Sequence, residues 1–134
     1  MKIVCVKGMP FAREAFSTLG EVAVREGRTL TTADVRDAEV LAIRSTTVVN
    51  RALLAGTRVR FVGTATIGTD HMDLAYLDGA GIRWCSAPGC NATSVAEYIA
   101  AALLELAVRQ GKPLRGRTLG VVGVGQVGSR VVRV

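Results

Sequence analysis

Short apolar runs alternate with helix-like segments along most of the chain. Apolar runs of strand length occur five times, and they predict strands at Ile3–Val6, Val22–Val24, Val40–Ile43, Val59–Val62 and Ile82–Cys85. Apolar residues at helical spacing, or the residues that start and stop helices, predict helices at Pro10–Leu19, Asn50–Leu54 and Asp73–Leu77. This β–α order predicts an α/β fold with a largely parallel, flavodoxin-like or Rossmann-like sheet.

The longest helical segment runs from Ser94 to Gln110. Ser94-x-x-Glu97 has the spacing of a capping box, in which side chains and backbone amides satisfy one another at the start of a helix. Apolar residues cover nearly every side, so we expect this helix to be buried against two domains or a partner subunit. Its one polar edge carries Glu105 and Arg109, which are four residues apart and are expected to pair.

A glycine-rich turn follows another apolar run near the end of the sequence. Leu119–Val122 has the composition of a buried parallel strand and leads into Gly123-x-Gly125-x-x-Gly128, which opens a helical pattern. In a dinucleotide site these glycines serve a tight turn, a close backbone approach to the pyrophosphate and close helix–strand packing. The motif alone is weak, but its position between strand and helix predicts a dinucleotide site.

The patterns divide the chain into three segments. Residues 1–92 are expected to form one α/β domain, residues 93–113 an interdomain helix and linker, and residues 114–134 the start of a Rossmann domain. The acidic residue that binds the ribose is expected about 20 residues after the glycine motif, which is beyond Val134. We therefore expect the second domain to be incomplete and the 134-residue chain to lack catalytic competence.

Composition argues against nucleic-acid and membrane partners. The formal charge is +6, but the basic residues are scattered, and aromatic residues make up 4%, too few for a base-stacking platform. The longest apolar segment, Tyr98–Leu104, is bounded by Glu97 and Glu105, which argues against a membrane span. The first residues are also too short an apolar stretch for a signal peptide.

The three cysteines are expected to be free thiols. They cannot all pair with one another, and none lies in a C-x-x-C motif. Cys5 and Cys85 lie in apolar strand-like runs, so we predict that both are small buried residues of a protein in a reducing, cytoplasmic compartment.

Polar side chains follow two of the predicted strands. Arg44-Ser45-Thr46-Thr47 comes directly after Val40–Ile43, and Thr66 lies in the Gly/Thr-rich turn after the next strand. Ligands bind at the carboxyl ends of strands in parallel sheets, where a forked guanidinium and two hydroxyls suit a carboxylate or a phosphate. Ser and Thr are also ordinary turn formers, and the spacing alone supports both interpretations equally.

His71 is the only histidine. It could act as a general acid or base, since its ordinary pKa is near neutrality. It stands between Asp70 and Asp73 at a predicted helix start with no partner nearby in the sequence, so we favour a structural role. One histidine and no cysteine pair predict no metal site, and no catalytic residue is assigned to this chain.

Together these motifs resemble the D-2-hydroxyacid dehydrogenases. The resemblance rests on the α/β unit, the linking helix and the glycine turn, and it covers essentially the whole chain. Its most specific blocks are Gly63-Thr-Ala-Thr66 and Ala87-Pro-Gly-Cys-Asn91. The segment Val6-Lys7-Gly8 departs from the family pattern, which puts a role for that loop in doubt.

The resemblance implies an oxidoreductase with NAD as cofactor and a homodimeric assembly. It implies substrate binding by Ser45 and Thr66, and NAD binding by Gly123, Gly125, Gln126, Val127 and Gly128. The blocks are most similar to those of family members that act on 4-phosphoerythronate, a small anionic substrate, in pyridoxal phosphate synthesis. The family's catalytic Arg, Glu and His belong to the later nucleotide domain. A member that acts on phosphoglycerate and a non-catalytic small-ligand module are the alternatives.

Overall fold

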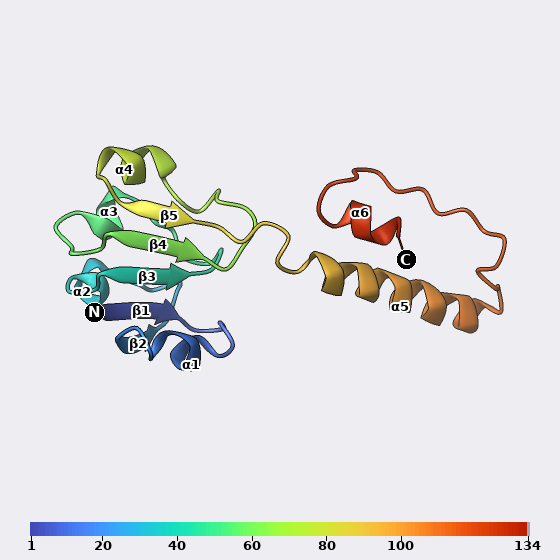
Figure 1. Ribbon diagram of the computed structural model, residues 1–134, viewed down its shortest axis with the longest axis horizontal. Coiled ribbons are helices and arrows are strands. Elements are labelled where there is room, and N and C mark those ends of the chain that lie inside the picture. The colour runs from blue at the N-terminus through green and yellow to red at the C-terminus, as the bar shows by residue number, and fades with distance from the viewer. Residues whose placement is uncertain (134) are drawn as a thin grey trace. The chain divides into compact units, whose positions relative to one another are not determined.

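The computed structural model describes residues 1–133, which form two compact units. One unit spans Met1–Ala87 and the other begins at Pro88. The first unit holds a five-stranded parallel sheet with short helices between its strands (Figure 1). The α/β fold that the sequence predicts is therefore confirmed.

Strands and helices alternate strictly through the first unit. Its strands are β1 (Lys2–Val6), β2 (Glu21–Arg25), β3 (Val40–Ile43), β4 (Phe61–Thr64) and β5 (Arg83–Cys85). Its helices are α1 (Ala12–Phe16), α2 (Thr32–Val35), α3 (Arg51–Leu54) and α4 (Leu74–Gly79). The sheet order is β2-β1-β3-β4-β5, in which all neighbouring strands run parallel.

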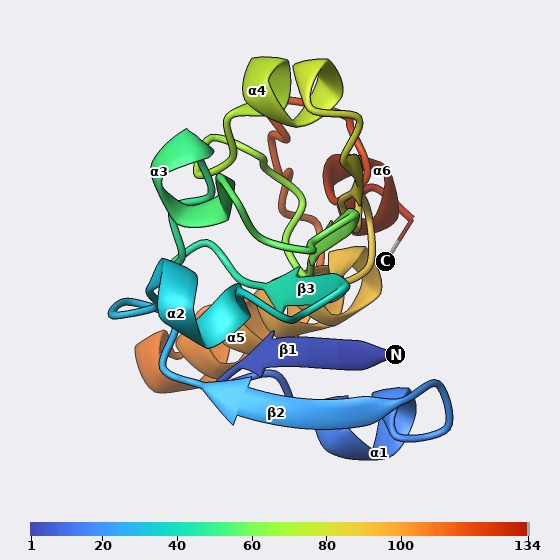
Figure 2. The ribbon, with the colours of Figure 1, turned by 90° about the vertical axis from the view of Figure 1, so that its left-hand side faces the viewer.

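Side chains from alternate positions of the strands enter two separate apolar clusters. Val4 and Leu41 belong to the larger cluster, which α2, α3 and α4 complete. Cys5 and Ala42 belong to the other cluster, to which α1 contributes Ala12. Figure 2 shows α1 on the other side of the sheet from α2 and α3. This alternation is the two-residue period of a strand, so each strand of the centre is covered on both faces.

On the second face, α1 packs against β1 and β2. The register aligns Cys5, Ala42, Gly63 and Cys85 in one row across the sheet. Cys5 is fully buried under α1, whereas Cys85 at the other end of the row is exposed. The prediction that Cys85 is buried is therefore wrong, because helix α1 does not reach β5 within this unit.

Several predicted boundaries differ from the structure. β4 begins at Phe61 rather than Val59, because its pairing with β3 starts where Val40 meets Phe61. Helix α1 covers only part of Pro10–Leu19, since Phe11 before it has a left-handed backbone with φ of 56°. Helix α2 was not predicted.

A local cluster of hydrogen bonds stabilises the start of helix α2. The Thr31 hydroxyl and N–H donate to the Asp34 carboxylate over 2.6 and 2.9 Å, respectively. These two bonds, with a smaller contribution from Arg25, lower the pKa of Asp34 below its ordinary value. A Thr followed three residues later by Asp was therefore the sequence signal for this short helix.

The second unit contains the long helix α5 (Ala92–Gln110) and the short helix α6 (Gly128–Val131). α5 starts before Ser94, so Ser94 and Glu97 are internal and the predicted capping box is wrong. Glu105 and Arg109 form the predicted pair, at 2.7 Å. Within this chain Ala92 and Ala96 are its buried residues and Val108 is 77% exposed, so burial of the helix against two domains or a partner subunit stays a prediction.

The predicted strand Leu119–Val122 is also wrong. Among residues 1–133 no strand is assigned in the second unit, and Leu119 and Val122 are exposed. A strand is defined by hydrogen bonds to a neighbouring strand, which the described part of this unit does not offer. The apolar composition of Leu119–Val122 indicates a segment that favours burial. It does not indicate whether a neighbouring strand is present for it to pair with.

Candidate functional site

The strand order reverses between β1 and β3, which lie next to each other at the centre of the sheet. In doubly wound sheets this point opens a crevice at the carboxyl ends of the strands. The segment after Val6 and the segment after Ile43 both start at this edge. The first candidate site is therefore built from the residues that follow β1, β3 and β4.

Arg44 lies over the backbone of Gly8 at the switch point. Gly8 has a φ of 81°, and a Cβ built on it would lie 2.5 Å from Nη1 of Arg44. A side chain here would suffer backbone strain and would displace the guanidinium. The unusual Val6-Lys7-Gly8 segment thus makes room for an exposed, forked cation beside the end of β1.

Ser45 and Thr66 occupy equivalent positions on neighbouring strands. Ile43 pairs with Thr64, and each candidate lies two residues beyond its member of this pair. The Ala65 N–H donates to the Ile43 carbonyl over 2.9 Å, which continues the pairing toward both side chains. Ser45 is exposed and Thr66 is half-buried. The structure brings the two predicted substrate ligands to the same edge of the sheet.

Thr47 has a structural role in the same polar segment. Its side chain is buried, and its hydroxyl donates to the carbonyl of Gly27 over 3.1 Å. This bond ties the segment after β3 to the turn after β2. Of the polar residues after β3, Arg44, Ser45 and Thr46 are exposed and Thr47 stabilises the fold.

His71 has a partner that sequence reasoning missed. Its Nε2 lies 3.0 Å from Oγ1 of Thr64, which lies 2.6 Å from Oγ1 of Thr66. The Thr66 hydroxyl also donates to the Gly68 carbonyl over 3.1 Å. Burial lowers the pKa of His71, and Asp70 opposes this effect. The loop after β4 folds back on its own strand, which a search for partners adjacent in sequence could not find.

Backbone bonds hold the loop that carries His71. The N–H of the buried Val49 donates to the His71 carbonyl, and the Asp73 N–H donates to the Val49 carbonyl, both over 2.8 Å. Asp73 then caps α4, because its carboxylate accepts from the Tyr76 N–H over 3.0 Å. The structural position that we predict for His71 agrees with this frame, but the ring also faces the candidate site.

The glycine turn of the second unit is the other candidate site. Gly123 has a φ of 88°, and a Cβ on Gly128 would collide with the Gly123 carbonyl. A Cβ on Gly125, by contrast, would meet no atom within 4 Å. The three glycines thus differ in the way a dinucleotide turn requires: one bends the chain, one leaves the backbone open and one packs closely.

Gln126 and Val127 lie at the start of α6. Val127 is the residue before the helix, and its carbonyl accepts from the Arg130 and Val131 N–H groups over 2.9 and 3.0 Å. The Gln126 side chain lies against Gly89, where a built Cβ would be 2.9 Å from Oε1. The Pro88-Gly89 turn and the glycine turn therefore fit each other within this unit.

Arg130 fastens α6 to the start of α5. Its Nη1 donates to the Gln126 carbonyl over 2.7 Å, and its Nε donates to the Thr93 hydroxyl over 3.2 Å. The Arg130 guanidinium therefore holds the glycine turn against the start of α5 through hydrogen bonds to Gln126 and Thr93. At the start of α6 the Ser129 N–H donates to the Gly125 carbonyl over 3.0 Å, and the Arg130 N–H donates to the Val127 carbonyl over 2.9 Å.

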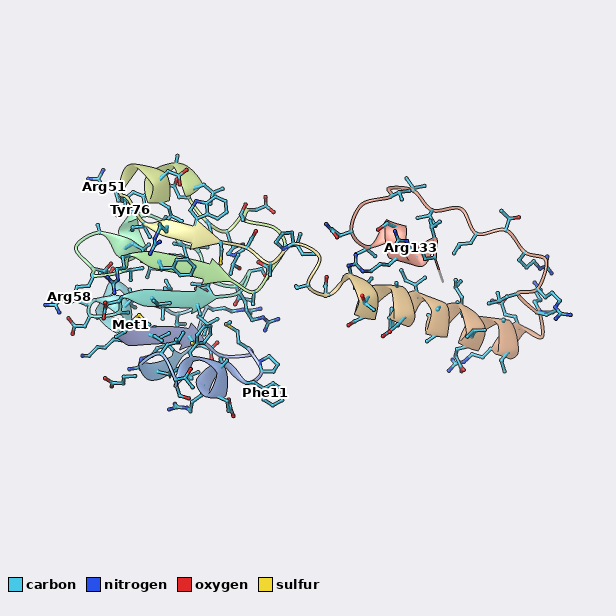
Figure 3. The ribbon with its side chains drawn as sticks, viewed as in Figure 1. Met1, Phe11, Arg51, Arg58, Tyr76 and Arg133 are labelled. Atoms are coloured by element: carbon cyan, nitrogen blue, oxygen red, sulfur yellow. The ribbon has the colours of Figure 1, made fainter. Side chains whose placement is uncertain are left out.

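A hollow of about 650 Å³ lies at the opposite, amino edge of the sheet. Met1 and Arg58, both on its lining, are labelled at that edge in Figure 3. Three of its charged groups pair with one another: Glu39 pairs with Arg60 at 2.5 Å and with the Met1 amino group at 3.9 Å. Since these carboxylate and cation groups are already paired, we assign no ligand to this hollow.

Residues 1–133 contain no group of three His, Cys, Asp or Glu side chains placed to hold a metal ion. Within the same range, none of the helices has the length and apolar composition needed to cross a membrane.

A family model, described as D-isomer specific 2-hydroxyacid dehydrogenase, catalytic domain, matches residues 3–119. The chain belongs to this family. The match includes β1 to β5 and the segments after them, so it covers all the residues of the first candidate site. The family that the sequence motifs resemble is therefore confirmed.

Curated members of the D-isomer specific 2-hydroxyacid dehydrogenase family are similar over almost the entire chain. An erythronate-4-phosphate dehydrogenase from Edwardsiella ictaluri is 56% identical over 99% of this chain, which covers 36% of that protein. One from Cronobacter sakazakii is also 56% identical, with coverage of 98% and 35%. The chain thus spans about a third of the length of these relatives.

Solved structures of the family share the fold. A 3-phosphoglycerate dehydrogenase from Entamoeba histolytica, with NAD+ bound, is 27% identical with a TM-score of 0.73, and 99% of this chain aligns to 49% of it. The apo D-lactate dehydrogenase from Escherichia coli has a TM-score of 0.79 at 18% identity, with coverage of 99% and 52%. The second likeness shows the fold alone.

Proposed function

We propose that this chain supplies the substrate-binding part of an NAD-dependent dehydrogenase that oxidises 4-phospho-D-erythronate to 2-oxo-3-hydroxy-4-phosphobutanoate. The observation that carries the proposal is the 56% identity to erythronate-4-phosphate dehydrogenases over nearly the full chain. We place this reaction in pyridoxal phosphate synthesis and expect the complete enzyme to be a cytoplasmic homodimer.

We assign substrate binding to Ser45 and Thr66, with Arg44 beside them. 4-Phosphoerythronate carries a carboxylate and a phosphate, and both are acceptors that a guanidinium and hydroxyl donors suit. Arg44 and Ser45 are exposed at the switch point, and Thr66 is half-buried in the segment after the neighbouring strand β4. The arrangement supports binding of one anionic end of the substrate at this edge.

We assign NAD binding to Gly123, Gly125, Gln126, Val127 and Gly128. The open backbone at Gly125 and the close packing of Gly128 against the Gly123 carbonyl fit a pyrophosphate at the start of α6. When bound, NAD would supply the acceptor for the hydride of the hydroxy acid. This chain's own contribution is to bind and orient, and we assign no proton transfer to its residues.

We further propose that residues 1–92 are the substrate domain, 93–113 the linker and 114–134 the start of the NAD domain. The two compact units, one ending at Ala87 and the other starting at Pro88, support a division close to the first boundary. All of the long helix α5 except its first residue, Ala92, then lies in the linker segment.

The substrate assignment is tested by titration of the ¹⁵N-labelled chain with 4-phospho-D-erythronate. We expect the amide signals of Ser45 and Thr66 to shift, and Arg44→Ala to weaken binding roughly tenfold, the loss of one charge-assisted hydrogen bond. Arg58→Ala, at the opposite edge of the sheet, is the matched control and should leave the affinity unchanged.

3-Phospho-D-glycerate distinguishes the nearest alternative reaction, because it has the same two charged ends and one carbon fewer. Tighter binding of this acid than of 4-phospho-D-erythronate would contradict the assignment and favour a phosphoglycerate dehydrogenase. Shifts confined to residues away from β3 and β4 would reject the site itself.

A further inference from the structure

The hydroxyl of Thr66 is the end of a hydrogen-bonded series that begins at His71. The series runs from His71 Nε2 to Thr64 Oγ1 over 3.0 Å and from there to Thr66 Oγ1 over 2.6 Å. It continues to the Gly68 carbonyl over 3.1 Å. Thr64, in the middle, is 3% exposed, so water has little access to it.

Counting protons fixes the direction of every bond in this series. A carbonyl oxygen only accepts, so the single hydroxyl proton of Thr66 points to Gly68. Thr64 must then donate its own proton to Thr66, and His71 must donate from Nε2 to Thr64. With all three bonds formed, His71 carries a proton on Nε2. Burial lowers the pKa of the ring, so in the neutral form this is its one ring proton.

We propose that His71 is a positioning residue for substrate binding, and this inference rests on the proposed contact between Thr66 and the substrate. His71 acts through Thr64 to hold one lone pair of the Thr66 oxygen, which leaves the Thr66 proton as the only group free to turn. An anionic oxygen of the substrate is a stronger acceptor than the Gly68 carbonyl and takes that proton. Gly68 is exposed, so water can replace the bond that it loses.

Two further features make His71 suited to this role. Each donor in a hydrogen-bonded series polarises the next, so donation from the ring strengthens Thr66 as a donor to an anion. The ring also stands on a fixed frame, because the His71 carbonyl accepts from the buried Val49 and Met72 is bonded back to Thr69. A rigid support is what a binding hydroxyl needs in order to be held in one orientation.

The proton position can be measured directly, because the chain has a single histidine. In the ¹⁵N-histidine-labelled protein without an affinity tag, two-bond ¹⁵N–¹H correlation spectra distinguish an Nε2 proton from an Nδ1 proton. We expect the Nε2–H form at pH 7.5, with its proton protected from exchange with water by the bond to Thr64, and we expect Thr64→Val to abolish this protection. Thr69→Val, in the same loop but outside the series, is the matched control and should retain it. An Nδ1–H ring in the unaltered protein overturns the proposal.

Affinity for 4-phospho-D-erythronate then tests the positioning role. We expect His71→Phe to weaken binding roughly tenfold, to about the level of Thr66→Val, because either change removes one well-oriented hydrogen bond. His71→Gln can present an amide N–H to Thr64 and should restore most of the affinity. The double variant His71→Phe/Thr66→Val should bind no more weakly than Thr66→Val alone.

The outcomes separate this inference from the proposed function. If His71→Phe binds as tightly as Thr69→Val, the positioning role is rejected while the substrate assignment stands. If the unaltered chain does not bind 4-phospho-D-erythronate, the substrate assignment fails for this chain and the positioning role fails with it. The ring spectrum would still show independently whether the hydrogen-bonded series exists.

Discussion

At the scale of single residues, Phe11 is under backbone strain. Among residues 1–133 it is the one non-glycine residue with a positive φ, at 56°. Its side chain, which is labelled in Figure 3, is 77% exposed. A bulky side chain in the left-handed region costs roughly 1–2 kcal/mol, and little burial offsets that cost here. Phe11 lies in the segment between β1 and α1, which also contains Gly8.

Replacing Phe11 with glycine should therefore stabilise the protein. We expect Phe11→Gly to raise the free energy of unfolding by about 0.5–1 kcal/mol, because glycine adopts this backbone without steric cost but loses more entropy on folding. Phe16→Ala is the matched comparison and should destabilise, since Phe16 packs against the cluster of Ile3 and Ala12. Urea denaturation measures both; a loss of stability in Phe11→Gly would show that Phe11 makes a favourable contact.

The lowered pKa of His71 predicts a dependence of stability on pH. Unfolding restores the ordinary pKa near 6.5, so between the folded and unfolded values the unfolded chain binds more protons. Stability should therefore rise with pH through the interval just below about 6.5 and reach its full value above it. Denaturation of His71→Gln at a series of pH values should lack this increment. An equal slope in both proteins would contradict the prediction.

At the scale of secondary-structure elements, the helix starts differ in what holds them. The Asn50 side chain accepts from the Leu53 N–H over 3.1 Å and caps α3, at the start of the predicted helix Asn50–Leu54. Ser94, whose spacing to Glu97 has the same kind of signature, lies within α5. The sequence pattern of a capping box therefore also occurs inside a helix, where its residues do not cap the helix start.

Paired alanine substitutions test this difference. Asn50→Ala should lower the free energy of unfolding by about 1 kcal/mol, because the orphaned N–H groups of α3 lose an acceptor. Ser94→Ala should be neutral or slightly stabilising, because alanine is the better residue in a helix interior. Thermal unfolding followed by circular dichroism measures both. A comparable loss in Ser94→Ala would mean that Ser94 caps the helix after all.

The accuracy of the sequence predictions follows from how each element is buried. The central strands β1 and β3 are covered on both faces by local neighbours, so their continuous apolar runs give nearly correct bounds. Leu119–Val122 has the same composition but needs a neighbouring strand, which composition does not reveal. The placement of Ser45 and Thr66 at one edge could be predicted because strand ends converge there, whereas the bond from His71 to Thr64 depends on how a loop folds back.

At the scale of the whole molecule, the two units differ in how much they bury. The buried apolar residues lie overwhelmingly in Met1–Ala87, whereas Ala92 and Ala96 are the buried apolar residues of the second unit within the described chain. Local opening is easiest where few apolar contacts are lost, so the second unit should open with the lower free energy.

Limited proteolysis should detect this difference. Trypsin is expected to cleave first after Arg115 or Arg117, which are exposed and outside the helices, before any site in Met1–Ala87. Mass spectrometry of the early fragments identifies the bonds. Initial cleavage within the first unit, for example after Arg36 or Arg51, would contradict this order of stability.

The three thiols differ in their accessibility to reagents. Cys5 is buried and its pKa is raised by that burial, while Cys85 and Cys90 are exposed and belong to different units. A maleimide should therefore modify two positions in native buffer and the third only in denaturant. Because the reactive pair straddles the junction after Ala87, each of the two units can be labelled at one thiol of its own.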